Sequence, residues 1–533
     1  MLGLEDSAGR WCEGEGDIRD IATAYFAHLF TTSNPINIAE IVGCVGRRVT
    51  NQCNAKLTKP VTQDEITRVV KTLNPTNAPG LDGFTGSFFQ QFWEDIAEDV
   101  SGVVQSFFHS GRMSWKVNHT HIVLIPKVHN PRKMTQWRPI ALCNILYKII
   151  SKVLTNLLKQ VLPGIVSLNQ SAFVAEQLIT DNILIVHEIL HSLKLRKGHD
   201  NQGLAIKLDM AKAYDRIEWP FLGAMLKALG FCDLFCSWVH ECISTVSYSI
   251  LLNGEAAGHI VPSRGLRQGD PLSPFLFLIC AEGLSALIRY HEERHSLTCF
   301  RFHPNGVSIT HLFFADDSVL FCQAEKQEGR NMKAILECYE RGSGQVINYD
   351  KSSIFFSHNC PMRARRQVVD ILKVQQNDGF GRYLGLHADF GASKKAVFDD
   401  VRKKIGSKLM GWSEQFLSQA GKEILIKAVA MAMPNYAMSC FMLPVSLCKE
   451  IEKDIARYWW NNNKDQKGIH WVSWQRLSLL KYAGGLGFCD LICFNLAMLA
   501  KIGWRIVQHP ESLLLKYEYG FSICSDDLFF SIR

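Results

Sequence analysis

Three aspartates stand at the ends of predicted strands, where their carboxylates could meet at one metal site. Asp209 closes the strand-like run 203–209, and Asp316 and Asp317 occupy the tip of a predicted hairpin over 311–322. Because Asp favours turns, either segment alone would be read as a plain turn. Mg²⁺, however, takes one or two carboxylates together with substrate phosphates, and two such ions about 4 Å apart serve phosphoryl transfer.

A cationic, glycine-rich loop, RGLRQGDPLSPFLF (264–277), lies between the two carboxylate segments in the sequence and leads into an apolar helix. Together the three pieces predict a divalent-metal site for phosphoryl transfer. A polymerase and a Mg²⁺-dependent nuclease would both need carboxylates of this kind.

The distribution of charge favours a polyanionic partner. With 58 Lys and Arg against 51 Asp and Glu, the net charge is only +7, yet residues 100–175 contain nine cations and no Asp or Glu. Such a surface suits a polyanion, because an acidic side chain would repel phosphate. A second basic stretch, 391–430, contains an amphipathic helix whose cations fall off its apolar stripe. That helix would either face a nucleic acid or present an ordinary solvated face.

Several other classes of protein are disfavoured. The 17 cysteines stand at irregular spacings in a chain of 533 residues, unlike a small secreted disulfide framework, and the N-terminus has no apolar signal segment. Glu282 and Pro434 interrupt the longest apolar stretches, so neither offers the ~18–20 clean apolar residues of a membrane span. We therefore expect a nuclear or cytoplasmic protein that is not secreted and does not bind a membrane.

Helix and strand signals alternate along the chain, which predicts one α/β or α+β core. Thr62 and Glu65 form a capping box at the start of one predicted helix. The apolar patterns predict helices over 61–72, 88–108, 140–162 and most of 396–460, and strands over 121–128, 203–209 and within 311–322.

Nine blocks, taken in order, carry a family resemblance. They are NAPGLDGF (77–84), IPKV (125–128), QWRPIALCNILYKIISKVL (136–154), NQSAFVAEQLITDNILIVHEILH (169–191), LDMAKAYDRIEW (208–219), RGLRQGDPLSPFLF (264–277), HLFFADDSVLF (311–321), SGQVINYDKS (343–352) and YLGL (383–386). In this order they resemble the reverse transcriptase of plant LINE-type non-LTR retrotransposons. Residues 18–35, 411–444 and 484–514 extend the resemblance over nearly the whole chain.

The resemblance implies an α+β right-hand polymerase with an antiparallel palm sheet and a helical thumb. It also implies a truncated polyprotein that lacks the endonuclease and a complete C-terminal zinc-binding segment. The expected parts are an N-terminal extension (1–56), fingers (57–200), a palm with the catalytic carboxylates and the primer grip (201–390), a thumb (391–463) and a truncated C-terminal segment (464–533).

The family's metal ligands fall on Asp209, Asp316 and Asp317, which the resemblance implies would hold two Mg²⁺ ions. Lys351 matches a lysine suited to protonating the departing pyrophosphate, although a plain surface lysine is the alternative. The primer-grip turn of the family falls on Tyr383, Leu384 and Gly385.

The family's nucleotide contacts fall on five further residues. Lys127 and Arg138 would hold the incoming triphosphate and stabilise the charge that builds on it. Tyr214 would lie under the sugar and leave no room for a 2′-OH, or would simply be a packed aromatic. Gln268 and Gly269 would lie against the nucleotide and the template.

Three positions depart from the family pattern. Asn77, Leu157 and Gln177 stand where relatives usually carry a cation. One phosphate contact is worth about one unit of salt slope, so these changes bear on the grip of the template. The three carboxylates are intact.

The function that the resemblance implies is RNA-directed DNA synthesis, in which a primer 3′-OH attacks a dNTP with the help of two Mg²⁺ ions. The partners would be an RNA template, a DNA primer and a dNTP, whereas the sequence leaves the oligomeric state open. The alternative is a catalytically decayed remnant that binds RNA in the same basic cleft. A nuclease accounts for the carboxylates but not for Tyr214 or the triphosphate cations.

Overall fold

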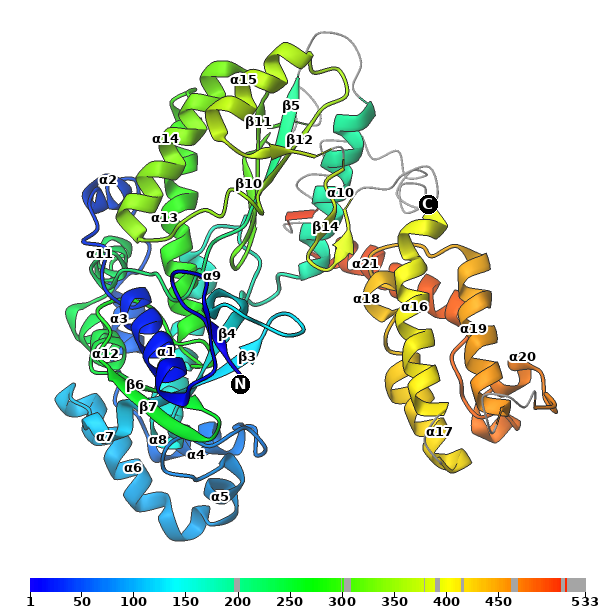
Figure 1. Cartoon of the computed structure of the whole chain (residues 1–533), viewed down its shortest axis with the longest axis horizontal. Helices are drawn as coiled ribbons and strands as arrows, with labels where there is room; N and C mark the ends of the chain where they lie inside the picture. Colours follow the sequence, from blue (N-terminus) through cyan, green and yellow to red (C-terminus); the bar gives the residue numbers. More distant parts are fainter. Residues whose placement is uncertain are drawn as a thin grey trace.

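The computed structural model describes residues 1–195, 202–298, 300–301, 308–377, 379–388, 394–413, 417–461, 468–509 and 513–514. The chain forms an arch with two limbs (Figure 1). One limb holds the N-terminal helices and a four-stranded sheet, and the other holds the helices that follow residue 394, with a five-stranded sheet at the top of the arch. Most of the predicted C-terminal segment after residue 509 lies outside the described residues.

The N-terminal limb is mainly helical. At α4 the predicted capping box is confirmed, because Thr62 accepts from the Glu65 amide and the Glu65 side chain accepts from the Thr62 amide. The elements of this limb outside its sheet are β1 (Leu4–Glu5), β2 (Trp11–Cys12), α1 (Glu15–Leu29), α2 (Ile38–Val42), α3 (Asn51–Leu57), α4 (Gln63–Lys71), α5 (Gly86–Gln91), α6 (Trp93–Ser110), α7 (Trp115–Asn118), η1 (Met134–Gln136), α8 (Ile145–Lys159) and α9 (Leu162–Ile165).

Two of the predicted helices have different bounds in the structure. The helix expected over 88–108 is two helices, because Phe92, at φ −102° and ψ 19°, ends α5 and begins α6. The helix expected over 140–162 starts only at Ile145, since Ile140–Leu142 belong to a strand. An apolar run of three residues fits both a helix and a strand, and the pairing with β3 (His119–Pro126) makes this one a strand.

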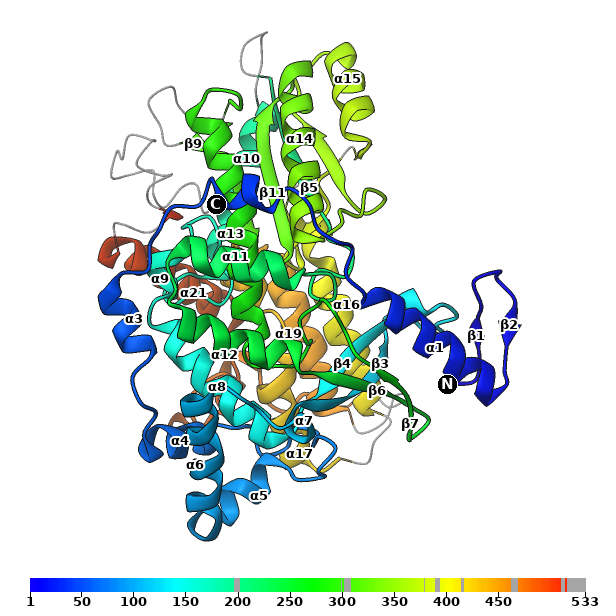
Figure 2. The same cartoon turned by 90° about the vertical axis from the view of Figure 1, so that its left-hand side faces the viewer.

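The four-stranded sheet has the order β4-β3-β6-β7. Its strands are β3 (His119–Pro126), β4 (Trp137–Leu142), β6 (Ser247–Leu252) and β7 (Glu255–Ile260). Only the β3–β6 pair is parallel. Helix α1 lies along β6 and β7, and Phe30 packs on Tyr248 with 5.1 Å between the ring centroids (Figure 2). The N-terminal extension is therefore part of the core around this sheet.

The five-stranded sheet has the order β10-β11-β5-β12-β13. Its strands are β5 (Gly203–Leu208), β10 (His311–Phe314), β11 (Asp317–Gln323), β12 (Ser353–Phe356) and β13 (Gln375–Gln376). The expected antiparallel pairing holds for the first four strands but is wrong at the edge, where β12 and β13 are parallel. The reason is the crossover helix α15 (Met362–Leu372) between them, since parallel neighbours need a long connection.

Alternate residues of β5 enter two different cores. Leu204, Ile206 and Leu208 pack in the core that contains α13 and α14, whereas Ala205 packs in the core that contains α10. Helices therefore cover both faces of this sheet, which fixes its register. The remaining elements between residues 179 and 387 are α10 (Ile179–Leu195), α11 (Trp219–Leu229), α12 (Asp233–Ser244), α13 (Ser273–Glu293), β8 (Phe300–Arg301), β9 (Ser308–Ile309), α14 (Lys326–Ser343), β14 (Arg382–Tyr383) and β15 (Leu386–His387).

The second limb is built from helices, as the sequence predicts for 396–460. Its α16 packs against α19, where Arg402 binds both Glu450 and Asp454. One cation of this helix is therefore paired with acids of the same limb. The elements are α16 (Lys394–Ser413), α17 (Gln419–Leu425), the π-helical turn η2 (Ile426–Ala430), α18 (Asn435–Met438), α19 (Val445–Trp460), α20 (Trp474–Leu477), η3 (Lys481–Ala483) and α21 (Leu491–Gln508).

By length and composition, α13 and α21 could each cross a membrane, a finding that the sequence did not lead us to expect. The apolar window of α13 is 83% buried, and its Glu282 pairs with Arg48 and Arg289, which is the environment of a core helix. The window of α21 is 22% buried, and length and composition alone are weak evidence for a span.

Candidate active site

The three aspartates come from neighbouring strands of the five-stranded sheet. Leu208 is the register partner of Ser318, so Asp209 leaves β5 beside Asp317, the first residue of β11. Asp316 lies in the turn between β10 and β11. Because paired residues of antiparallel strands lie about 4.5–5.5 Å apart at Cα, one strand pairing brings together two acidic segments that are distant in sequence.

The carboxylates influence one another. Burial raises the pKa of Asp316, and Asp209 raises it further, against the lowering effects of a backbone hydrogen bond and of Arg138. Burial also raises the pKa of Asp317, to which Asp316 and Asp209 add, while Lys207 acts in the opposite direction. The side chains of Asp316 and Asp317 are exposed, so a ligand can reach them.

The turn that carries Asp316 is held from outside the sheet. Ala315 has a φ of +54°, a conformation that non-glycine residues rarely adopt. Its amide donates to Oε1 of Gln170 over 3.0 Å, and the Ser171 amide donates to the Phe313 carbonyl over 3.1 Å. The segment around Gln170 therefore extends the edge of β10 and fixes the turn. Sequence reasoning did not identify Gln170 as a site residue, although it lies in the block NQSAF.

The other side of Asp209 faces the segment that contains Lys351. The Asp209 amide donates to Ser352 Oγ over 3.1 Å, and the Asn348 amide donates to the Asp209 carbonyl over 2.8 Å. Lys351 is exposed and close enough to Lys127 to lower the pKa of that lysine. The structure thus brings Lys351 to the Asp209 side of the site.

Lys127 and Arg138 stand at the loop end of the β3–β4 hairpin. Arg138 is the register partner of Ile125, and the Lys127 amide donates to the Gln136 carbonyl over 2.9 Å. Burial lowers the pKa of Lys127, and so does Arg138, whereas Asp209 raises it. The hairpin therefore delivers both predicted triphosphate cations to the carboxylates.

Not every cation of the carboxylate-free stretch is available. Arg132 and Lys133 both contact Glu5 of β1, at 2.7 and 3.9 Å. Lys148 is buried and donates to the Ala78 carbonyl over 3.3 Å. The basic surface is consequently narrower than the sequence alone suggests.

Tyr214 lies between the carboxylates and helix α13. Its ring stacks on Phe277 with 4.8 Å between the centroids and 15° between the planes. Burial raises the pKa of Tyr214, and the nearby Asp316 adds to that rise. Because the ring is held flat by its neighbour, it forms a rigid wall next to Asp316.

The loop 264–270 is anchored by a buried arginine. Arg267 donates to Asn118 Oδ1 over 2.5 Å, and its guanidinium lies 3.7 Å from Asp270 Oδ2. With that anchor in place, the Gln268 carbonyl accepts from the Ala141 amide over 2.8 Å. Gly269 has a φ of +112°, which favours glycine, so the loop approaches β4 closely.

The predicted primer-grip turn joins β14 to β15. Leu384 and Gly385 have φ values of +47° and +85°, as in a two-residue hairpin turn with left-handed central residues. Lys207 of β5 donates to the Arg382 carbonyl, and Tyr436 of α18 donates to the Leu384 carbonyl over 2.8 Å. Sequence reasoning missed Tyr436, because nothing in its own segment indicates that it reaches this turn.

The three departures from the family pattern have different settings. Asn77 is exposed, and Leu157 packs against the hydrophobic core, so an apolar side chain fits there. Gln177 is half-buried, and its Oε1 is buried without a hydrogen-bond partner among the described residues.

The carboxylate oxygens of this site could supply some, but not all, of the ligands of a divalent cation. Among the described residues, no three His, Cys, Asp or Glu side chains converge closely enough to hold an ion by themselves. Mg²⁺, however, binds through one or two carboxylates and completes its shell with water and phosphate oxygens. The mutual effects of Asp209, Asp316 and Asp317 on pKa reflect crowded negative charge, which a divalent cation would neutralise.

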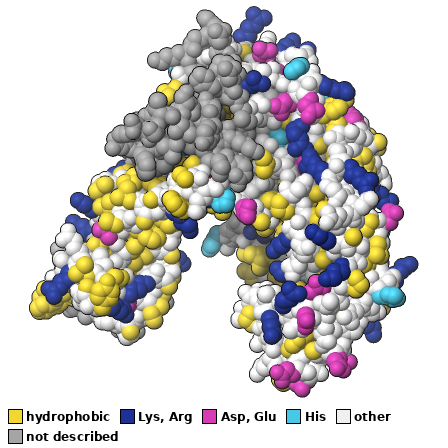
Figure 3. All heavy atoms as spheres, turned by 180° about the vertical axis from the view of Figure 1, so that it is seen from behind, with side chains coloured by type: hydrophobic (Ala, Val, Ile, Leu, Met, Phe, Trp, Pro, Cys, Tyr) yellow, Lys and Arg dark blue, Asp and Glu magenta, His cyan; other side chains and the backbone are white. Residues whose placement is uncertain are grey.

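The space between the two limbs is a wide hollow (Figure 3). Lys and Arg side chains are spread over the limb on the right of that view, whereas acidic side chains gather at its lower end. The exposed acids of α6 are Glu94, Asp95, Glu98 and Asp99. A polyanion would therefore be favoured along the limb and repelled from its tip.

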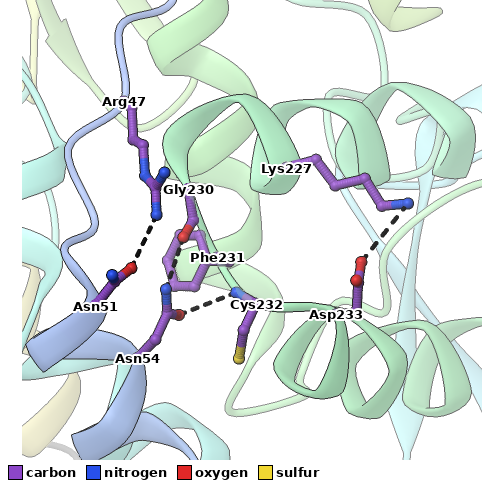
Figure 4. A pocket seen from close by; sticks show the side chains of 8 residues that line it. All are labelled: Arg47, Asn51, Asn54, Lys227, Gly230, Phe231, Cys232 and Asp233. Carbon is purple, nitrogen blue, oxygen red and sulfur yellow. Dashed lines mark hydrogen bonds and ion pairs between the residues drawn. The ribbon is translucent and has the colours of Figure 1, made fainter.

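A smaller pocket of about 490 Å³ lies between α3, α11 and α12 (Figure 4). Asn54 crosses it, donating to the Gly230 carbonyl over 2.8 Å and accepting from the Cys232 amide over 2.9 Å. Lys227 and Asp233 face each other at 3.9 Å. Asn54 therefore joins α3 to the connection between α11 and α12 across this pocket.

Comparison with known protein families gives one match. Residues 125–388, which contain all three aspartates and the β3–β4 hairpin cations, match the family described as reverse transcriptase (RNA-dependent DNA polymerase).

Curated relatives come from transposable elements and from plants. The chain is 26% identical over 482 residues, 88% of its length, to the transposon TX1 uncharacterized 149 kDa protein of Xenopus laevis, of which it covers 35%. It is 28% identical over 290 residues, 54% of its length, to a retrovirus-related Pol polyprotein from a type-1 retrotransposable element R2 of Nasonia vitripennis, of which it covers 26%. It is 47% identical over 85 residues, 16% of its length, to an uncharacterized mitochondrial protein of Arabidopsis thaliana, of which it covers 55%. The chain therefore spans about a third of the length of the Xenopus relative.

Proposed function

We propose that this chain is the RNA-directed DNA polymerase of a plant LINE-type non-LTR retroelement. The observation that carries the proposal is the strand pairing that places Asp209 beside Asp317, next to a hairpin that delivers Lys127 and Arg138. The match to the reverse transcriptase family and the relatives among transposable elements support it. The similarity to an Arabidopsis protein supports the plant origin.

The arch corresponds to a right hand in this proposal. Residues 57–200 are the fingers, 201–390 the palm and 391–463 the thumb, while 1–56 and 464–533 flank them. The hollow between the limbs holds the RNA template paired with its DNA primer. Phosphates of that duplex meet the cations of the N-terminal limb, and so binding weakens as salt rises.

The three aspartates would hold two Mg²⁺ ions together with water and the dNTP phosphates. When bound, such ions activate the attacking oxygen and stabilise the leaving one. The primer 3′-OH loses its proton to water as its oxygen forms a bond to the α-phosphorus of the dNTP, and the bond from that phosphorus to the oxygen that bridges to the β-phosphorus breaks. Pyrophosphate leaves with the electron pair.

The surrounding residues hold and orient the reactants. Lys127 and Arg138 bind the triphosphate and stabilise the charge that develops on it. Tyr214 lies under the sugar and excludes a 2′-OH, with its ring fixed by Phe277. Lys351 donates a proton from Nζ to the pyrophosphate.

Two further groups orient the nucleic acid. Gln268 and Gly269 lie against the nucleotide and the template. The turn formed by Tyr383, Leu384 and Gly385 holds the primer terminus.

The decisive experiment is primer extension on poly(rA)/oligo(dT) with the purified protein and Mg²⁺. We expect incorporation of dTTP that stops in EDTA and in the Asp316→Ala and Asp209→Ala variants. Asp370→Ala, which changes an exposed aspartate on α15, serves as the matched control and keeps full activity. Extension by Asp316→Ala at the wild-type rate would refute the assignment of the site.

The same assay separates the alternatives. A decayed RNA-binding remnant would bind RNA in a salt-sensitive manner, equally well in wild type and Asp209→Ala, and would incorporate no nucleotide. A nuclease would shorten a labelled template in the absence of dNTPs. Either result would overturn the polymerase proposal.

A further inference from the structure

Lys212 occupies an unusual turn directly after the Asp209 strand. Its φ is +55°, in the left-handed region that non-glycine residues rarely adopt. The turn is held by the Asp215 amide, which donates to the Lys212 carbonyl over 3.0 Å, and by the Ala211 amide, which donates to the Val346 carbonyl over 2.8 Å. A strained residue in a fixed turn suggests that the direction of its side chain matters.

The side chain of Lys212 reaches the hairpin that carries the triphosphate cations. Its Nζ donates to the Trp137 carbonyl over 3.1 Å, and Trp137 is the residue before Arg138. The centroid of the Tyr25 ring, from α1, lies 5.8 Å from the same Nζ. The ammonium thus contacts both the β3–β4 hairpin and the N-terminal helix.

Several cations crowd this position. Lys127 and Arg138 each act on the pKa of Lys212, and Arg138 and Lys351 act on that of Lys127. Asp215, only 6% exposed, is the buried acid that faces Lys212 and Lys127. Like charges gathered in this way repel one another, so an anionic ligand of several charges would stabilise the cluster.

Donors remain for such a ligand. An ammonium has three N–H donors, and in the described part of the chain Lys212 donates one hydrogen bond, to the Trp137 carbonyl. Two donors are consequently free to bind phosphate oxygens. A point charge with rotatable donors suits a phosphate chain.

We propose that Lys212 is a further triphosphate-binding residue, whose ammonium contacts the phosphate chain of the incoming dNTP beside Lys127 and Arg138. The proposal rests on the proposed function, and it gives the N-terminal helix α1 a place at the back of the nucleotide site through Tyr25. The phosphates of the template backbone carry the same chemistry, so the test has to distinguish these two sources.

The test measures equilibrium binding without turnover. The protein is loaded with poly(rA) paired to an oligo(dT) that ends in a dideoxynucleotide, and dTTP and dTMP are then titrated. We expect Lys212→Gln to weaken dTTP binding by about tenfold or more, which corresponds to the loss of a charge-assisted contact, and to leave dTMP binding unchanged. Lys212→Arg keeps most of the affinity, and Lys326→Gln, which changes an exposed lysine on α14, keeps all of it.

The outcomes are distinguishable from those of the proposed function. Equal dTTP affinity in wild type and Lys212→Gln overturns the assignment, and so does weaker binding of the duplex itself with dTTP affinity unchanged, which would indicate a template contact. A third outcome is possible, in which wild type prefers dTTP over dTMP and Lys212→Gln loses that preference, but wild type does not extend a primer. In that case only the polymerase proposal is wrong. A melting temperature measured for each variant, together with the Lys212→Arg protein, separates loss of the contact from loss of the fold.

Discussion

The phenol of Tyr436 donates a 2.8 Å hydrogen bond to the carbonyl of Leu384, across 52 positions of sequence. Tyr436 belongs to α18 of the helical limb, and Leu384 is the first central residue of the β14–β15 turn. Gly385 is the next residue of the turn, and a Cβ added to it would lie 3.8 Å from the Tyr436 ring. The helical limb therefore supports the turn that we propose as the primer grip.

We expect Tyr436→Phe to raise the KM for the primer–template duplex severalfold and to leave the KM for dTTP unchanged, because the turn loses its support and the nucleotide site does not. The cost in stability is about 1 kcal/mol, the net worth of one hydrogen bond. Steady-state extension kinetics at varied duplex and varied dTTP give both constants. Tyr482→Phe, at a tyrosine that is 89% exposed, is the matched control. A change confined to the KM for dTTP would contradict the role of Tyr436.

Gln170 should affect catalysis rather than binding. Its Oε1 accepts from the amides of Ala172 and Ala315, so Gln170→Leu leaves two donors without that acceptor and loosens the turn that carries Asp316. Each unsatisfied donor costs about 1–3 kcal/mol. We expect kcat for dTTP incorporation to fall by at least about tenfold, with little change in KM, as judged by single-turnover kinetics.

The matched control for this change is Gln327→Leu, at an exposed glutamine on α14. A Gln170→Leu protein that melts like wild type and has an unchanged kcat would show that the turn does not depend on this side chain.

Tyr214 should control the choice of sugar. Tyr214→Ala removes the ring that we propose lies under the nucleotide. The ratio of kcat/KM for UTP to kcat/KM for dUTP should therefore rise by about 10- to 200-fold, the range for one group in a shaped pocket. Tyr214→Phe keeps the ring and the stack on Phe277, and it should discriminate like wild type. Incorporation of UTP and dUTP on poly(rA) measures the ratio. An unchanged ratio in Tyr214→Ala would leave this tyrosine a purely packed aromatic.

Asp215 should make stability depend on pH. Burial raises the pKa of this carboxyl from 3.8 to about 6, against the effects of Lys212, Lys127 and Arg216. Between these two values the folded protein binds the proton more tightly than the unfolded chain does, so the contribution of Asp215 to stability falls as pH rises from about 4 to about 6. Tyr25 and Tyr248 also face this carboxyl, and neither titrates in that range.

Asp215→Asn removes the titration and keeps the shape. We expect the melting temperature of wild type to fall relative to that of Asp215→Asn as pH rises from 4 to 6, and the difference to level off above pH 6. Thermal melts of both proteins in matched buffers measure it. A difference that stays constant from pH 4 to 7 would place the pKa of Asp215 near its ordinary value.

Local patterns predicted the elements well where one signal dominated. The capping box at Thr62 and the alternation in 203–208 gave α4 and β5 correctly. Ile140–Leu142 were misassigned to a helix, because three apolar residues fit both periods and only the pairing with β3 favours the strand. The parallel edge of β13 could not be predicted, since it depends on where the α15 crossover returns the chain.

The sequence by itself determined which residue types are present for phosphoryl transfer and in what order they follow, from the Asp209 strand to the Asp316 turn and the 383–385 turn. It also determined that residues 100–175 contain nine cations and no Asp or Glu. Only the tertiary structure decided that Gln170 accepts a hydrogen bond from Ala315, that Tyr436 donates one to Leu384, and that Glu5 forms an ion pair with Arg132. The physical reason is that each of these contacts joins segments that are far apart in the chain, so no local periodicity or spacing encodes it. Such contacts exist only when packing of the cores has fixed the positions of both partners.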